Sequence, residues 1–126
     1  MAERVLVIDD SESIRSILRL TLRFRGYEVV EAASGEEGLA ALGRERFDLV
    51  FCDLAMPGVN GLEVIRRARA NPDTHAVPII VLSAEERETK TRALAEGAND
   101  CVDKPFAPER ILEILAHYLP QEKVGG

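Results

Sequence analysis

The chain has 126 residues, which is enough for one domain with a hydrophobic core of its own. Its hydrophobic content of 46% and charged content of 30% are ordinary for a globular protein, and its net charge of −6 argues against a nucleic-acid backbone or an anionic membrane as the main partner. Because the sequence has neither an apolar run of about 18 residues nor an apolar signal segment, we expect a cytoplasmic protein.

Short runs rich in β-branched residues alternate with segments of helical periodicity. The predicted strands cover residues 5–8, 27–32, 49–52, 78–82 and 101–102. This strict alternation predicts an α/β fold with a doubly wound parallel sheet, covered by helices on both faces. A pair of carboxylates follows the first strand where a glycine-rich loop would otherwise stand, which disfavours a dinucleotide-binding Rossmann unit.

Cap residues delimit the predicted helices. On the first helix, Arg15, Arg19 and Arg23 recur every fourth residue and indicate a solvated face, with a partner surface as the alternative. The second helix opens with a Ser-x-x-Glu capping box. The helices are expected near Ser11–Gly26, Ser34–Gly43, 61–71 and 85–96, and from Ala107 onward.

The fourth predicted helix is expected to be the loosest. Its apolar anchors are confined to residues 93–95. Two possible ion pairs at i,i+4 spacing, Glu86–Lys90 and Glu88–Arg92, contribute only about 0.2–0.5 kcal/mol each. Little else fastens this helix to a core.

Polar residues follow four of the predicted strands. Asp9 and Asp10 come after the first, Asp53 after the third, Ser83 after the fourth and Lys104 after the fifth. Because the carboxyl ends of parallel strands meet at one edge of the sheet, where ligands bind, we expect these side chains to lie close together.

Three carboxylates at one edge need positive charge nearby. Two unit charges about 4 Å apart repel by roughly 4 kcal/mol at an effective dielectric near 20. Oxygen ligands without histidine or cysteine suit a hard divalent cation such as Mg²⁺. A cation, a carboxylate, an ammonium and a hydroxyl are together the groups needed to transfer a phosphoryl group to Asp53.

This set of motifs resembles a known family. The sequences DD at 9–10, DLAMPGVNG at 53–61, SA at 83–84 and KPF at 104–106 are similar to those of bacterial two-component response-regulator receiver domains, of the chemotaxis-receiver type. The resemblance covers about residues 3–118 and implies a flavodoxin-like (βα)5 fold with strand order 2-1-3-4-5. The domain is expected at 1–119, with 120–126 as a flexible tail or truncated linker.

The resemblance implies a role for each carboxylate. Asp53 would be the phospho-acceptor. Asp10 and Asp53 would ligate Mg²⁺ directly, Asp9 would do so mainly through water, and the backbone carbonyl of Ala55 would be a further ligand. Mn²⁺ would substitute for Mg²⁺.

The resemblance also implies the remaining site residues and the partners. Ser83 and Lys104 would contact the phosphoryl group. The donor would be a sensor histidine kinase or a histidine phosphotransfer domain, with small acyl phosphates as substitutes. The output would pass to a downstream protein or to an output domain absent from this chain, with no role for nucleic acid or membrane. Such a domain promotes its own phosphorylation and dephosphorylation, and is a switch rather than a turnover enzyme.

One switch position departs from the family pattern. Three residues before Lys104, receiver domains usually carry an aromatic ring that moves with the hydroxyl, and this chain has Cys101. Coupling from Ser83 to that position is therefore in doubt. A disulfide to Cys52 is rejected because the third and fifth strands would lie about 9–10 Å apart, beyond the roughly 7 Å Cα limit for such a bond.

Two other functions would use some of the same residues. A receiver fold used only for docking, without phosphorylation, is supported by Cys101 and opposed by the complete set of site residues. A Mg²⁺-dependent phosphatase with an aspartyl nucleophile ranks last, because those families typically carry a carboxylate where this chain has Ala55. Singly, Asp9 and Asp10 could cap a helix, Asp53 begin a turn and Lys104 lie on the surface, but all four coincide at one edge.

Overall fold

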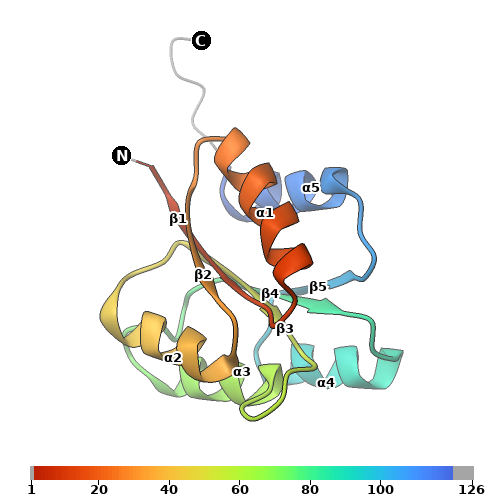
Figure 1. Cartoon of the computed structure of the whole chain (residues 1–126). Coiled ribbons are helices and arrows are strands. Elements are labelled where there is room, and N and C mark those ends of the chain that lie inside the picture. The colour runs from red at the N-terminus through yellow and green to blue at the C-terminus, as the bar shows by residue number, and fades with distance from the viewer. Residues whose placement is uncertain (1, 121–126) are drawn as a thin grey trace.

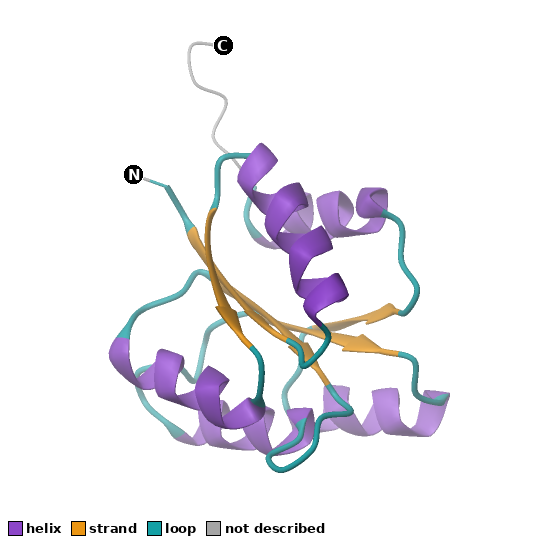
Figure 2. Cartoon of the chain, viewed as in Figure 1, coloured by secondary structure: helices purple, strands orange, loops and turns teal. Residues whose placement is uncertain are grey.

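The computed structural model describes residues 2–120, in which strands and helices alternate from end to end (Figure 1, Figure 2). Each predicted strand is present, and its ends differ from the predicted ones by one residue at most. Apart from Pro120, the predicted tail lies outside the described residues. The elements are β1 (Arg4–Ile8), α1 (Glu12–Phe24), β2 (Glu28–Ala32), α2 (Gly35–Arg44), β3 (Leu49–Asp53), α3 (Gly61–Ala70), β4 (Ile79–Ser83), α4 (Arg87–Glu96), β5 (Asp100–Asp103) and α5 (Pro108–Tyr118).

The strands form one parallel sheet in the order β2-β1-β3-β4-β5, which confirms the predicted topology. The helices α1 and α5 cover one face, and α2, α3 and α4 cover the other (Figure 1). Because β1 has β2 on one side and β3 on the other, the order of strands reverses there. The carboxyl ends of β1 and β3 are therefore the place where an open α/β sheet binds ligands.

A hydrophobic core lies on each face of the sheet. Successive residues of a strand point to opposite faces, so Leu6 and Ile8 join the core against α2–α4, whereas Val5 and Val7 join the core against α1 and α5. Since both faces are covered, β3 and β4 are buried along their whole length. This burial explains why their sequences are continuous apolar runs rather than alternating ones.

The predicted capping box of α2 is present in altered form. The hydroxyl of Ser34 accepts a hydrogen bond from the Glu37 N–H at 3.1 Å. The Glu37 carboxylate accepts from the N–H of Ala33 rather than from that of Ser34. The helix continues to Arg44, one residue past the predicted end at Gly43.

The helix α4 has few anchors, as its sequence predicts. Its N-cap residue, Glu86, makes no side-chain capping bond, and Ala93 is its one buried residue. The prediction was wrong in two details. Leu94 is 46% exposed and Ala95 is exposed too, so neither anchors the helix. Lys90 pairs with Asp103 of β5 instead of Glu86, and within this fully described helix neither i,i+4 pair forms.

The C-terminal end of α4 is held by Arg69 of α3. The guanidinium donates from Nε to the Gly97 carbonyl at 3.0 Å, from Nη2 to Asn99 Oδ1 at 2.8 Å and from Nη1 to the Val77 carbonyl at 2.7 Å. Burial lowers the pKa of Arg69. Gly97 has a φ of 125°, and a Cβ there would lie 2.8 Å from Arg69 Cγ, so this close approach requires glycine.

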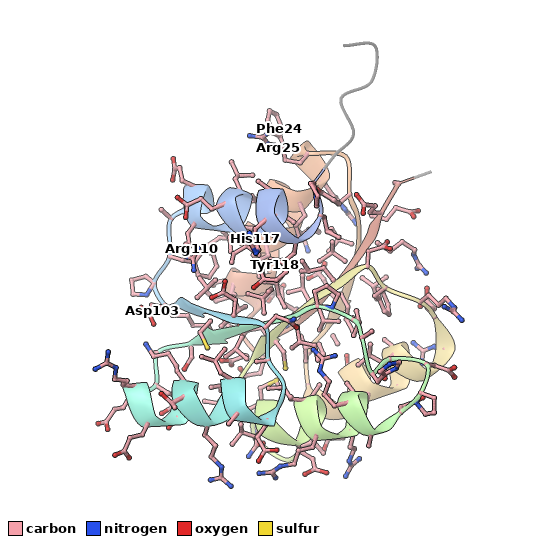
Figure 3. The ribbon with its side chains drawn as sticks, turned by 180° about the vertical axis from the view of Figure 1, so that it is seen from behind. Phe24, Arg25, Asp103, Arg110, His117 and Tyr118 are labelled. Carbon is pink, nitrogen blue, oxygen red and sulfur yellow. The ribbon has the colours of Figure 1, made fainter. Side chains whose placement is uncertain are left out.

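Large apolar side chains are exposed along α1. Ile17, Leu20 and Phe24 are 44%, 68% and 88% exposed, and Figure 3 shows Phe24 pointing away from the rest of the chain.

On the neighbouring α5, Tyr118 donates a hydrogen bond to the Asn99 carbonyl at 3.0 Å and fastens that helix beside β5. Within residues 2–120, every helix is too short or too polar to cross a membrane.

Candidate functional site

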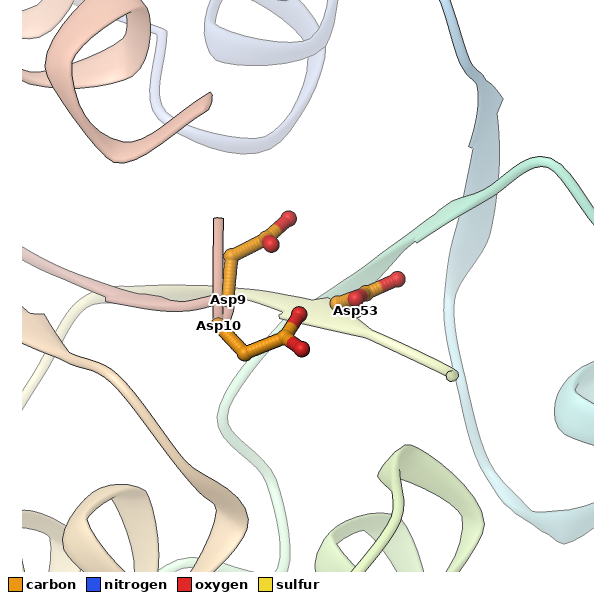
Figure 4. Close-up of side chains that lie close together, drawn as sticks. All are labelled: Asp9, Asp10 and Asp53. Carbon is orange, nitrogen blue, oxygen red and sulfur yellow. The ribbon is translucent and has the colours of Figure 1, made fainter. Parts of the chain in front are cut away.

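The carboxyl ends of four strands bring the predicted site residues to one edge of the sheet. Asp53 and Ser83 are the last residues of β3 and β4. Asp9 directly follows β1, and Lys104 directly follows β5. Figure 4 shows the carboxylates of Asp9, Asp10 and Asp53 gathered where β1 and β3 end.

The three carboxylates form a compact cluster. One oxygen from each of Asp9, Asp10 and Asp53 lies within 4.8 Å of the others. Asp9 and Asp53 are buried, whereas Asp10 is exposed. The Ser11 N–H donates to Asp9 Oδ1 at 2.9 Å and holds that side chain at the start of α1.

Lys104 supplies the positive charge of the site. Its Nζ lies 2.8 Å from Asp9 Oδ2 and 3.2 Å from Asp53 Oδ1. Burial by itself would lower the pKa of Lys104, but the two carboxylates outweigh it, so the pKa is raised and the ammonium stays charged. The site thus holds three carboxyl groups and one ammonium, so acidic groups outnumber the basic one.

Asp53 titrates in an unusual range. The pKa of Asp53 is raised from 3.8 to about 6, mainly by burial and also by the neighbouring charge of Asp9. The ammonium of Lys104 and the N–H of Ala55 act in the opposite direction and limit it. At neutral pH, Asp53 is therefore mostly a carboxylate, which is the form that can act as a nucleophile.

The donor set fits a hard divalent cation. All the clustered ligand atoms are carboxylate oxygens, the type that Mg²⁺ prefers. The buried Asp9 Oδ2 faces the ammonium of Lys104 at 2.8 Å and has no further partner among the described residues. A buried oxygen with unused accepting capacity, beside excess negative charge, is what a cation site requires.

Ser83 joins the edge at a fixed position. Its buried hydroxyl accepts a hydrogen bond from the Glu85 N–H at 2.8 Å, and its carbonyl accepts from the Lys104 N–H at 2.9 Å. The hydroxyl hydrogen remains free to be donated to a ligand. Ala55, the predicted carbonyl ligand, lies exposed in the loop that follows Asp53.

This loop folds back tightly against the end of β3. The Gly61 N–H donates to the Leu54 carbonyl at 3.1 Å. A Cβ at Gly61 would lie 2.4 Å from the Asp53 carbonyl oxygen, so only glycine allows α3 to begin this close to the site. The tight turn thus brings the start of α3 directly against the end of β3.

Cys101 lies in β5, half-buried, with its Sγ 3.9 Å from the Lys90 carbonyl of α4. Cys52 is fully buried in β3, and both thiols are free. Because β4 lies between β3 and β5, rejection of a disulfide is confirmed.

The sequence analysis missed Arg15. Its Nη1 donates to the Asp9 carbonyl at 2.7 Å, and its Nε lies 3.4 Å from a Glu31 carboxylate oxygen. Arg19 also binds Glu31, at 2.7 Å, so the predicted solvated stripe was wrong for these two arginines and holds only for Arg23, which is exposed. A basic residue five positions after an aspartate pair was the available signal.

Comparison with known families gives a match along most of the chain. The sequence model of the response regulator receiver domain matches residues 5–116. The phosphate regulon transcriptional regulatory protein PhoB of Rhizobium meliloti is 38% identical over 118 residues, which cover 92% of this chain and 52% of that protein. The response regulator MprA of Mycolicibacterium vanbaalenii is 42% identical, covering 99% and 55%. The chain spans about half the length of these curated relatives.

Solved structures confirm the fold. The chemotaxis protein CheY4 of Vibrio cholerae superposes with a TM-score of 0.89 at 38% identity, over 94% of this chain and 100% of that one. The receiver domain of the sensor histidine kinase PA1611 of Pseudomonas aeruginosa has a TM-score of 0.88 at 27% identity, over 96% and 100%. That structure has a magnesium ion coordinated in its active site cleft.

Proposed function

Because the chain belongs to the response regulator receiver domain family, we propose that it is a phospho-accepting switch with Asp53 as the acceptor. The carboxylate cluster carries this proposal, since it places Asp53 among two further carboxylates and 3.2 Å from an ammonium. The donor is a phosphohistidine of a sensor histidine kinase or a phosphotransfer domain, and small acyl phosphates can replace it.

The transfer uses the residues of this edge. An oxygen of Asp53 attacks phosphorus, the bond from phosphorus to the imidazole nitrogen breaks, and its electron pair stays on the imidazole. Lys104 and the hydroxyl of Ser83 bind the phosphoryl oxygens and stabilise their charge. Water later hydrolyses the aspartyl phosphate to carboxylate and phosphate, so the domain resets itself and is not a turnover enzyme.

The cation of the proposed site is Mg²⁺, with Mn²⁺ as a substitute. Asp10, Asp53 and the carbonyl of Ala55 would hold it directly, and Asp9 would do so through water. When bound, the cation neutralises the excess carboxylate charge and the charge of the incoming phosphoryl group.

Phosphorylation can be tested with acetyl phosphate and Mg²⁺, followed by intact-mass measurement. The wild type is expected to gain one phosphoryl group, and Asp53→Asn none. Asp103→Asn is the matched control, because Asp103 is 73% exposed and lies outside the carboxylate cluster. Undiminished phosphorylation of Asp53→Asn would exclude Asp53 as the acceptor.

Cys101 favours a second candidate, a receiver fold that docks to its partner without phosphorylation. A thiol fills less space than an aromatic ring. A movement of the Ser83 hydroxyl would therefore displace the side chain at position 101 less than it would displace a ring. Hydrogen exchange over residues 84–104 with and without beryllofluoride distinguishes the candidates. A change in protection supports the switch, whereas unchanged protection with unchanged partner binding supports phosphate-independent docking.

A further inference from the structure

We propose that Arg15 is a positioning residue that orients the Asp9–Asp10 segment for cation binding, and that Glu31 holds Arg15 in place. The inference rests on the proposed function, because the cation concerned is the one that phosphoryl transfer to Asp53 requires. It assigns a role to a side chain of α1 that lies beside the carboxylate cluster but is not part of it.

Asp10 depends on its backbone for its direction. It is the exposed member of the cluster, and no described residue forms a hydrogen bond or ion pair with its carboxylate. The carboxylates of Asp9 and Asp53, by contrast, contact Lys104. Whatever fixes the main chain at this point therefore also aims the Asp10 side chain at the cluster.

Arg15 fixes that main chain. Its bond of 2.7 Å goes to the carbonyl oxygen of Asp9, which belongs to the peptide group joining Asp9 to Asp10. Because a peptide group is planar, holding its oxygen also sets the direction in which the Asp10 Cα leaves it. A guanidinium donor makes this bond stronger than a neutral one.

Glu31 keeps the guanidinium in this position. Its Oε1 lies 3.4 Å from Arg15 Nε, and its Oε2 accepts from Arg19 Nη1 at 2.7 Å. Side chains of Arg15 and Glu31 are only 16% and 27% exposed, so water screens their attraction less than at an open surface. One carboxylate on β2 thus ties two turns of α1 to the sheet.

Positioning and plain electrostatics predict opposite outcomes when Arg15 is removed. Arg15 is a positive charge close to a cation site, so its Coulomb effect alone would weaken cation binding, and its loss would strengthen it. If Arg15 positions Asp10, its loss weakens binding instead. The sign of the change therefore identifies the role.

The test is a Mg²⁺ titration by isothermal calorimetry on wild type, Arg15→Met and Arg19→Met. Methionine keeps the apolar stem of each side chain and removes the guanidinium. Arg19→Met is the matched control, because Arg19 binds Glu31 but makes no bond to Asp9. We expect about tenfold weaker binding for Arg15→Met, a size typical of groups that orient metal ligands, and unchanged or slightly tighter binding for Arg19→Met.

Three outcomes overturn the inference. Equal or tighter binding by Arg15→Met, with normal binding by the wild type, overturns the role of Arg15 alone. Equal weakening in both variants overturns it too, because a general loss of charge or helix packing would then suffice. Absence of Mg²⁺ binding by the wild type overturns the proposed function together with this inference. If Arg15→Met does not fold, Arg15→Lys must bind Mg²⁺ more weakly than the wild type.

Discussion

Partly buried charged side chains lie at two opposite edges of the sheet, and they differ in how many of their hydrogen bonds are made within the protein. At the amino edge, before β4 and β5, Arg69 donates from each of its three nitrogens to a carbonyl or amide oxygen. At the carboxyl edge, the carboxylates of Asp9 and Asp53 share the ammonium of Lys104, and no described residue pairs with the carboxylate of Asp10.

The difference separates a structural charge from one kept available for a ligand. A partly buried guanidinium that donates to several main-chain oxygens contributes to stability, whereas a buried polar group left without a partner costs stability. At the amino edge, the hydrogen bonds of Arg69 hold α3, the following loop and the end of α4 together. At the carboxyl edge, carboxylate oxygens remain available as ligands of the proposed cation, which in turn assists binding of the phosphoryl group.

The largest expected effect on stability follows from removing the guanidinium of Arg69. Arg69→Met should lower the free energy of unfolding by about 3 kcal/mol, because several partly buried carbonyls lose their donor. Urea denaturation measures this. The control is Arg67→Met, whose guanidinium is 57% exposed and pairs with Glu63 within α3, and its effect should stay within about 0.5 kcal/mol. Equal effects of both variants would contradict the contrast between the edges.

A smaller loss of stability is expected when a methyl group is added at Gly97, against the side chain of Arg69. Gly97→Ala should cost about 2 kcal/mol, because it strains a φ of 125° and places Cβ 2.8 Å from Arg69 Cγ. Gly43→Ala in α2 is the control, since nothing lies within 4 Å of its added Cβ. That variant should gain about 0.5–1 kcal/mol from helix propensity. Thermal unfolding of both proteins would expose the opposite signs.

At the carboxyl edge, removing a charge should stabilise the fold. Without Mg²⁺, Asp53→Asn is expected to raise the free energy of unfolding by about 1–2 kcal/mol, because it relieves repulsion and desolvation that raise the Asp53 pKa to about 6. Urea midpoints in the presence of a chelator measure this. A destabilised variant would show that the Lys104 ion pair outweighs the repulsion.

The stability gained by Asp53→Asn should depend on pH. The folded pKa of Asp53, about 6, lies above its ordinary value of 3.8, so the folded state holds the proton more tightly. The stability due to this group is complete below pH ~4 and is lost as the pH rises through about 6. The advantage of Asp53→Asn over the wild type should therefore grow between pH 4 and 7. A constant difference over this range would contradict the raised pKa.

Much of the fold and site could be predicted because local signals agreed. Apolar runs between capped helices indicated the parallel sheet, and the polar residue at each strand exit indicated the edge where Asp9, Asp53 and Lys104 meet. These inferences need only the direction of a strand, which topology supplies.

Contacts that depend on side-chain direction could not be predicted. The spacing of Arg15 and Arg19 fits a solvated face as well as it fits pairing with Glu31, because the helix period does not say how α1 is rotated over β2. Arg69 binds oxygens from three separate segments, an arrangement without any periodic signature. Lys90 could reach either Glu86 or Asp103, and only the folded chain decides.

Because α4 is attached more firmly at its last turn than at its first, a rigid rotation of this helix would pivot about its last turn. Its 10 residues span about 15 Å. Arg69 fixes the end at Gly97, whereas the first turn has no side-chain cap and is tied to β5 through the pair of Lys90 with Asp103. A rotation of roughly 10° about the fixed end displaces the first turn by about 2.6 Å on that length. Atoms at the start of α4, next to the carboxyl edge, therefore travel farthest for a given rotation, while the amino edge stays still.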